Sequence, residues 1–446
     1  MADFCRFGPG RVDRSVKVLV LGAYGLIGAE IVRDLTRAGH EVVGFGRSAD
    51  LGRRLVPGIA WIGGDLARMT RPETWTAALA GVEAVVNASG ALQDGLKDRL
   101  TESQNLSIAA LIRACEAVGA RRFVQISAPG AEPTAATAFL RTKAAADAVL
   151  RASTLDWIVL KPGLVVGANA YGGTSLLRML AAFPLIQPLV LGDRPVQTVA
   201  LAEVAAAVTL AVSGQVPGRR DYDLMEPRPR ALREVVAAFR RWLGFPPAWA
   251  ALDLPAALGF ALARGADLAG WLGWRSPLRT TALRVMAEGV TGDPEPWTAA
   301  TGRRFGSLEK TLTALPSTLQ ERSFARGRLV FPMLLGLLSM FWLASGVIGA
   351  WRLSESMRVL DGVMPEAAAG AFVLAGAAAD VAIGLCLLVR RWTRPAAWAA
   401  IVLSFGYMAA ATVLTPWLWS DPLGPLVKIL PGIGLALAVA ALAEER

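Results

Sequence analysis

Histidine and cysteine are scarce in this chain of 446 residues. His40 is the only histidine, which excludes His-rich metal sites and leaves one candidate base for a Ser-His-Asp mechanism. It lies in the turn between a predicted helix and the next strand, and we interpret it as a surface turn residue. Cys5, Cys115 and Cys386 are too scattered for a disulfide framework or a cysteine metal site. We therefore expect no bound metal.

Charged residues are also few. They make up 18% of the chain, against 54% hydrophobic residues, and the mean hydropathy is +0.44. Such values are too apolar for an ordinary soluble protein and indicate membrane spans. Residues 329–446 hold seven basic and seven acidic residues, so the whole net charge of +10 lies before them. A basic part beside a membrane suits an anionic lipid surface. No basic and aromatic patch stands out, so we expect a lipid bilayer as partner and no nucleic acid.

Four apolar segments follow Arg328, and each is about 20 residues long, enough to cross a hydrocarbon core of about 30 Å. Arginines precede the first segment and lie between the second and third, whereas the other two loops carry few basic residues or none. The positive-inside rule then places the preceding domain and the C-terminus in the cytoplasm. The sequence predicts an integral protein of the cell inner membrane with four transmembrane helices. The segments are at about 329–350, 367–389, 395–414 and 424–443.

A few ionisable residues interrupt apolar stretches. Asp380 lies in the middle of a span, where it is a functional candidate or a structural hydrogen-bond partner between helices. Lys428 lies near the start of the fourth span and could extend to the interface. The apolar stretch 254–274 contains Arg264 and Asp267, each costing roughly 2.5–3.5 kcal/mol at a bilayer centre. We interpret that stretch as a packed or interfacial helical segment rather than a span.

Strand and helix patterns alternate from residue 16 to about residue 243. This alternation predicts an α/β fold with a doubly wound parallel sheet and helices on both faces. The stretch 246–328 that follows is helical and rich in tryptophan. The expected strands are 17–21, 41–45, 59–62, 84–87, 122–127 and 156–161, and the expected helices include 26–38, 73–80, 103–118 and 137–151.

A glycine motif follows the first strand. Gly22, Gly25 and Gly28 are spaced by three residues and run into a helical pattern. The first allows a tight turn, the second lets a pyrophosphate approach the backbone, and the third lets the helix pack closely on the sheet. Free N–H groups at the helix start would face the phosphates. The motif predicts dinucleotide binding by the stretch 22–28, including Tyr24, Leu26 and Ile27.

Residues after the next strands add to this site. Arg47 follows the second strand, where an arginine favours the 2′-phosphate of NADP(H), although an exposed arginine without that role is also common. Asp65 and Leu66 follow the third strand and could meet the adenine. The small residues of the stretch 88–90, Ala88, Ser89 and Gly90, follow the fourth strand near the nicotinamide ribose. We expect NADP(H) as the preferred cofactor, with NAD(H) as the alternative.

These motifs, in this order, resemble the short-chain dehydrogenase/reductase superfamily in its extended or atypical, NmrA-like branch. The resemblance covers about residues 16–245 and implies a Rossmann domain that binds NAD(P). It continues through the stretches 123–128, 139–143 and 160–167. Four parts follow: a flexible N-terminal tail at 1–15 without a signal peptide, the NAD(P)-binding domain with substrate-side lid elements at 16–245, a helical juxtamembrane region at 246–328, and a membrane domain at 329–446.

The resemblance also implies catalytic residues. In that family a serine orients the substrate carbonyl, a lysine binds the nicotinamide ribose, and a tyrosine one helical turn before the lysine transfers the proton. Ser127 and Lys143 match the serine and the lysine, although each could instead be an ordinary polar residue. Phe139 occupies the tyrosine position, and phenylalanine cannot donate a proton. Tyr171, on the predicted lid side, is a candidate substitute.

The C-terminal spans resemble the DoxX-like membrane family, by their number, by Asp380 and by the stretch 421–431. An all-α bundle of four transmembrane helices is therefore expected. Together the parts predict a membrane-anchored NADP(H)-binding reductase that acts on a lipid-soluble acceptor such as a quinone. One alternative is a non-catalytic NAD(P)H-binding sensor or assembly protein with a membrane protein partner. The other is an epimerase-like enzyme, which Phe139 disfavours because such enzymes need a tyrosine base.

Overall fold

The computed structural model describes residues 14–90, 99–274 and 276–443. The chain divides into two compact units: the first comprises Met1–Asp267 with Ser276–Arg322, and the second Leu268–Arg275 with Ser323–Arg446. Most of the expected N-terminal tail, residues 1–13, lies outside the described residues. The division into four parts stays a prediction.

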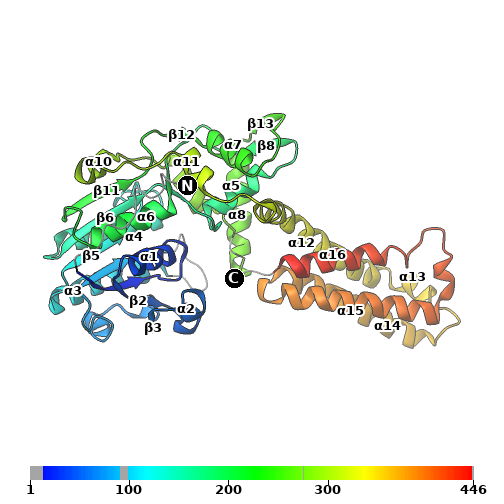
Figure 1. Cartoon of the computed structure of the whole chain (residues 1–446). Helices are drawn as coiled ribbons and strands as arrows, with labels where there is room; N and C mark the ends of the chain where they lie inside the picture. The colour runs from blue at the N-terminus through cyan, green and yellow to red at the C-terminus, as the bar shows by residue number, and fades with distance from the viewer. Residues whose placement is uncertain (1–13, 91–98, 275, 444–446) are drawn as a thin grey trace. The chain divides into compact units, whose positions relative to one another are not determined.

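A seven-stranded parallel sheet forms the centre of the first unit, in the order β11-β6-β5-β4-β1-β2-β3 (Figure 1). The doubly wound sheet and the six expected strands are confirmed. The sequence does not predict β11, because charged residues interrupt the apolar pattern of a buried strand. The strands are β1 Lys17–Leu21, β2 Glu41–Gly46, β3 Ala60–Gly63, β4 Ala84–Asn87, β5 Arg122–Ile126, β6 Asp156–Pro162 and β11 Arg220–Leu224.

Helices cover both faces of this sheet. Along β1, alternate side chains enter two separate apolar cores, because successive side chains of a strand point to opposite faces. The helices α1 (Leu26–Arg37) and α6 (Leu201–Val212) contribute to one core. The helices α3 (Ser107–Val118) and α4 (Ala138–Ala152) contribute to the other. Both faces of the sheet are therefore buried, which leaves the edge where the strands end as the place for a ligand.

Shorter elements complete the first unit. Three small strand pairs flank the main sheet: β7 Leu164–Val166 with β10 Thr198–Ala200, β8 Ile186–Leu189 with β13 Ala250–Asp253, and β9 Pro195–Val196 with β12 Arg230–Ala231. The remaining helices and helical turns are α2 Ala49–Leu55, η2 Leu66–Arg68, η3 Pro72–Trp75, η4 Thr101–Leu106, α5 Gly173–Ala181, α7 Leu232–Trp242, α9 Thr280–Glu288, α10 Glu295–Thr301 and α11 Leu308–Ala314. The helix α8 Ala256–Trp271 begins in the first unit and ends in the second.

Two sequence-based expectations are wrong here. The stretch 73–80 is not an α-helix: it holds the short 3-10 turn η3, in which the buried Trp75 indole donates to the carbonyl oxygen of Met69 at 3.1 Å. His40 follows the turn after α1 but is buried, because its ring lies between Val16 and Ser213. Its Nδ1 accepts from the backbone N–H of Val16 at 3.3 Å, so Nε2 carries the hydrogen that faces Ser213 Oγ at 3.1 Å. Burial lowers the pKa of His40.

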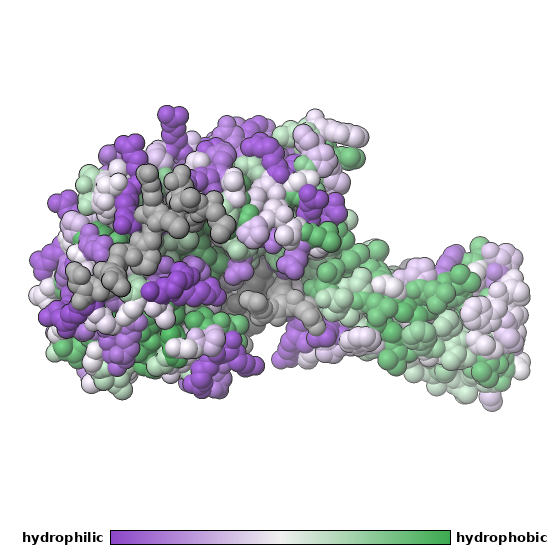
Figure 2. All heavy atoms as spheres, in the orientation of Figure 1, coloured by the Kyte–Doolittle hydropathy of each residue, from purple (hydrophilic) through white to green (hydrophobic). Residues whose placement is uncertain are grey.

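The second unit is helical, and its surface is largely hydrophobic (Figure 2). Among the described residues, three helices are long and apolar enough to cross a membrane: α12 Leu319–Trp351, α14 Glu366–Leu388 and α15 Arg390–Leu414. The fourth apolar segment forms the shorter α16 Ile429–Leu442, because 424–428 form turns rather than helix. Three long apolar helices indicate an integral membrane protein, while the number of crossings and their orientation stay predictions. The elements α13 Leu353–Arg358 and η5 Pro416–Trp419 lie in the loops.

Candidate functional site

The glycine turn connects β1 to α1 with very little space. Gly22 has a positive φ of 70°, and its carbonyl oxygen accepts the Gly25 N–H at 2.8 Å. A Cβ at Gly28 would lie 2.2 Å from that same oxygen, so only glycine lets α1 start this close to the strand. Among the described residues no side chain caps the first turn of α1. Leu26 and Ile27 form that half-buried turn, whose backbone N–H groups suit a phosphate.

The glycine turn faces the loop after β4. β1 lies between β2 and β4, so the strand order reverses there, which is where parallel α/β sheets bind ligands. A Cβ at Gly22 would lie 2.9 Å from the carbonyl oxygen of Ala88. Asn87 fixes this loop, because its Oδ1 accepts both the N–H and the hydroxyl of Ser89, at 3.1 and 2.5 Å. The expected residues Ala88, Ser89 and Gly90 thus lie beside the glycine turn.

Two further expected residues lie at the ends of β2 and β3. The Tyr24 ring covers the end of β2, since a Cβ at Gly46 would lie 2.3 Å from its Cε1. Arg47 follows directly and is exposed. Asp65 is exposed and caps η2, accepting the Ala67 N–H at 3.1 Å, while the neighbouring Leu66 is half-buried. The expected cofactor residues therefore all lie at the same edge of the sheet.

Lys143 is buried where the ends of β4 and β5 meet. Its Nζ donates to the carbonyl oxygens of Ile126 at 2.6 Å and of Ser89 at 3.3 Å. An ammonium has three donors, so one is left for a ligand. A Cβ at Gly90 would lie 3.5 Å from Nζ, which places the ammonium just below the loop surface. Burial lowers the pKa of Lys143 to about 8, with the nearby Asp147 carboxylate opposing the shift.

Asp147 is a site residue that the sequence analysis missed. It lies one helical turn after Lys143 and is completely buried. Ser127 donates its hydroxyl to Asp147 Oδ2, while Oδ1 has no hydrogen-bond partner. Burial raises the pKa of Asp147, although Ser127 and Lys143 oppose the shift. A signal was present in the sequence: a carboxylate four residues after a lysine lies on the same helix face.

The two aromatic candidates lie in different surroundings. Phe139 is half-buried on α4, one turn before Lys143, and offers no polar atom. Tyr171 lies in the loop before α5 and is 63% exposed. Its backbone N–H bonds to Thr174 Oγ1 at 3.2 Å, which fixes the loop rather than the ring. The structure therefore brings Ser127, Lys143 and Asp147 together, whereas the Tyr171 side chain points into solvent.

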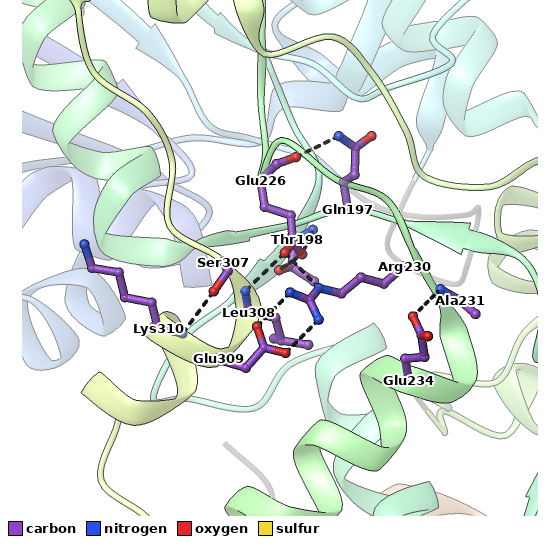
Figure 3. Close-up of polar contacts among 10 residues, drawn as sticks. All are labelled: Gln197, Thr198, Glu226, Arg230, Ala231, Glu234, Ser307, Leu308, Glu309 and Lys310. Carbon is purple, nitrogen blue, oxygen red and sulfur yellow. Dashed lines mark hydrogen bonds and ion pairs between the residues drawn. The ribbon is translucent and has the colours of Figure 1, made fainter.

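Glu226, a buried carboxylate shortly after β11, organises the small strands (Figure 3). Glu226 accepts from the N–H and hydroxyl of Thr198, at 3.0 and 2.6 Å, and from the Leu308 N–H at 3.2 Å. It also accepts from Arg230 Nε at 3.0 Å, and Arg230 in turn binds Glu309 at 2.6 Å. These donors to the Glu226 carboxylate come from β10, β12 and α11, so the cluster connects the three elements and has a structural role.

No metal site is formed by His, Cys, Asp or Glu side chains in the part of the chain that the structure describes. Two family models match separate parts of the chain. Residues 22–178 match a family of NAD(P)H-binding domains, and residues 339–437 match the DoxX-like family. The first match includes the glycine turn and Lys143, and the second includes Asp380 and both α14 and α15.

Individual proteins are similar to this chain over part of its length. The chain is 27% identical over 238 residues to an NAD(P)H azoreductase of Xenophilus azovorans, covering 53% of this chain and 77% of the relative. It is 26% identical over 232 residues to a photosystem II assembly factor of Synechocystis sp., covering 51% of this chain and 68% of that relative. A solved NADPH-dependent quinone oxidoreductase of Escherichia coli, complexed with NADPH, has a TM-score of 0.52 at 17% identity, over 66% of this chain and 98% of that one. This structural likeness shows the fold alone.

Proposed function

Because the chain joins an NAD(P)H-binding Rossmann domain to a DoxX-like domain with long apolar helices, we propose that it is a membrane-anchored, NADP(H)-dependent reductase. Its acceptor is a lipid-soluble molecule such as a quinone. Such acceptors are dissolved in the lipid bilayer, and the anchor keeps the domain at the cytoplasmic surface of the inner membrane. The relative from Xenophilus azovorans, an NAD(P)H azoreductase, supports reductase chemistry.

The observation that carries this proposal is the cradle at the ends of β1 and β4. Because Gly22 and Gly28 lack a Cβ, the turn packs against the Ala88 carbonyl and α1 starts close to β1, with its first turn uncapped. Gly25 is exposed there and has no side chain to fill the place of a pyrophosphate. This donor set fits a dinucleotide: backbone N–H groups for the pyrophosphate, Arg47 for a 2′-phosphate and Lys143 for a ribose. Asp65 caps the turn on the adenine side.

The chemistry needs a hydride and a proton. A bound nicotinamide supplies the hydride. Burial favours the protonated form of Asp147 by raising its pKa, and the Ser127 hydroxyl is hydrogen-bonded to it directly after β5. When the acceptor oxygen gains negative charge, the Ser127 hydroxyl turns from Asp147 toward it, gives it the hydroxyl proton and takes the Asp147 proton in return. A quinone thereby gains one hydride and one proton and becomes a hydroquinone, and Asp147 regains its proton from water. This relay takes the place of the tyrosine hydroxyl, which is missing at position 139 because the residue there is Phe139.

Two measurements on the purified full chain test the proposal. Fluorescence titration with NADPH should saturate in the range of about 1 μM to 1 mM, the usual range for enzyme substrates. NADPH oxidation should then depend on added quinone. Titration without saturation below about 1 mM would refute nucleotide use, and saturation without oxidation by any quinone, azo compound or carbonyl compound would refute turnover.

Arg47 decides between the two cofactors in this proposal. Arg47→Ala should weaken NADPH binding by about tenfold or more and leave NADH binding nearly unchanged, because only NADPH carries the 2′-phosphate. Dissociation constants for both nucleotides, measured on both proteins, give the result. Arg53→Ala, which removes an exposed arginine on α2, serves as the matched control. An equal loss for the two nucleotides contradicts the assignment.

Lys143 gives nucleotide binding a pH dependence. Its folded-state pKa of about 8 means that the ammonium loses its proton, and its charge, as the pH rises through that value. A ribose oxygen bound by the ammonium favours the protonated form, so NADPH affinity should be highest below this pH and fall above it. Titrations on either side of the pKa measure the step. Lys143→Met should bind more weakly and show no step, and a step that persists in this variant points to another group.

A non-catalytic NAD(P)H sensor or assembly protein is the second candidate. Phe139 favours it, because the side chain at the proton-donor position is inert, and one relative is a photosystem II assembly factor. Phe139→Tyr separates the two candidates. A reductase that uses the relay should oxidise NADPH in both forms, with the variant at most a few times faster. An inert wild type and an active variant would favour the sensor.

A further inference from the structure

The second unit contains a cavity of about 380 Å³ between α12, α14 and α15. Ser356 of α13, Leu360 and Leu418 of η5 also belong to its wall. Most of the wall is apolar, with Phe372, Leu360 and Leu414 among its side chains. Its polar groups are concentrated around one carboxylate, that of Asp380.

Asp380 is held from two neighbouring helices. It is 4% exposed, and its Oδ2 accepts the Ser345 hydroxyl of α12 at 2.7 Å. Its Oδ1 accepts the Tyr407 hydroxyl of α15 at 2.7 Å, and that hydroxyl also lies 3.1 Å from the carbonyl oxygen of Gly376. Gly346 lets α12 approach, because a Cβ there would lie 3.0 Å from Asp380 Cβ. Three helices therefore fix this carboxylate at the cavity wall.

No positive side chain balances Asp380 in the described part of the chain. Its contacts are the two hydroxyl groups, and no ion pair includes it. Lys428, the one basic residue near the start of the fourth apolar segment, is exposed. An ionised carboxylate inside a membrane is costly unless a counter-charge reaches it. The cavity supplies the space for that charge, with the Phe372 and Tyr407 rings in its wall.

We propose that this cavity binds a small, lipid-soluble organic monocation, with its charge against Asp380 and its apolar part against the cavity wall. Aromatic rings attract such a cation through their faces. A metal ion fits poorly, because hard cations need about six oxygen ligands and the wall offers one carboxylate with a few hydroxyls. The site is formed within the second unit and does not depend on the proposed reductase activity.

Benzyltrimethylammonium and neopentylbenzene test this proposal, because they have nearly the same shape and differ in charge. Tritiated benzyltrimethylammonium should bind saturably to the full chain in lipid nanodiscs, and neopentylbenzene should displace it only at a concentration at least about tenfold higher. Asp380→Asn, which keeps the shape, should raise the dissociation constant of the cation by about tenfold or more. Glu366→Gln, which changes an exposed carboxylate at the start of α14, should leave it unchanged.

A second variant covers the case in which Asp380→Asn does not fold. Ala411→Leu adds a larger side chain to the cavity wall and leaves Asp380, Ser345 and Tyr407 unchanged, so it should abolish saturable binding. Three results would overturn the proposal: no saturable binding to wild type, equal displacement by the neutral compound, or unchanged binding in both variants. Displacement by durohydroquinone at lower concentration than by the unlabelled cation would also overturn it, since it would identify the site as one for neutral hydroxyl compounds.

Discussion

Gly28→Ala is expected to abolish saturable NADPH binding, with an increase of the dissociation constant of about 100-fold or more. The new Cβ would lie 2.2 Å from the carbonyl oxygen of Gly22 and 2.8 Å from its carbon. Both are backbone atoms of the tight turn, so they cannot rotate away as a side chain could. Either α1 or the turn must move, and the N–H groups that should face the pyrophosphate move with it. Fluorescence titration with NADPH, beside thermal unfolding, measures the change.

Gly265→Ala is the matched control, because Gly265 is also a helical glycine and a Cβ there meets no atom within 4 Å. It should bind NADPH as the wild type does. Gly25→Val provides a second variant if Gly28→Ala fails to fold. Gly25 is exposed, and the only close neighbour of its Cβ would be the Gly22 oxygen at 3.1 Å. Its side chain would stand in the proposed pyrophosphate position, so wild-type affinity in this variant would disprove the cradle.

Asp147→Asn is expected to lower the turnover number with a quinone by about 100-fold or more, the usual contribution of a positioned proton donor. Asparagine fills the same buried space and still hydrogen-bonds to Ser127, but it has no acidic proton to pass on. NADPH affinity should change little, because Lys143 keeps its contacts with Ile126 and Ser89. Steady-state kinetics across pH, together with nucleotide titration, separate the two effects. At saturating NADPH, the falling limb of the wild-type turnover number against pH, where Asp147 loses its proton, should disappear in the variant.

Glu203→Gln is the control for this substitution. Glu203 is also a buried carboxylate with a raised pKa, but it accepts from the backbone N–H groups of Ala200 and Gly306, away from Ser127. Its variant should turn over at a rate close to that of the wild type. If Asp147→Asn also keeps the wild-type rate and pH profile, the proton comes from another source, and the relay through Ser127 is wrong.

Much of the fold could be predicted from local patterns. Runs of apolar residues of strand length, alternating with helical periodicity, indicated the first six strands, and apolar segments of about 20 residues indicated the membrane helices. β11 lies at the edge of the sheet, where charged side chains can reach solvent, so its sequence lacks the apolar pattern of a buried strand. The fourth apolar segment is helical over 14 residues only, since hydropathy does not show where turns end a helix. The expected cofactor residues gather at one edge because parallel strands all end there.

The sequence by itself determined the class of the two parts, because strand and helix periodicity and hydrophobic length are local properties of the chain. The glycine spacing likewise identified the turn. Where two backbone segments lie too close together for a Cβ, the residue must be glycine, whatever the rest of the fold is. Only the tertiary structure decided which side chains meet. Ser127 and Asp147 are 20 residues apart and come from the loop after β5 and from α4, and Ser345, Asp380 and Tyr407 come from three helices. Such contacts depend on how elements pack, and burial then changes the chemistry of the carboxylates it encloses.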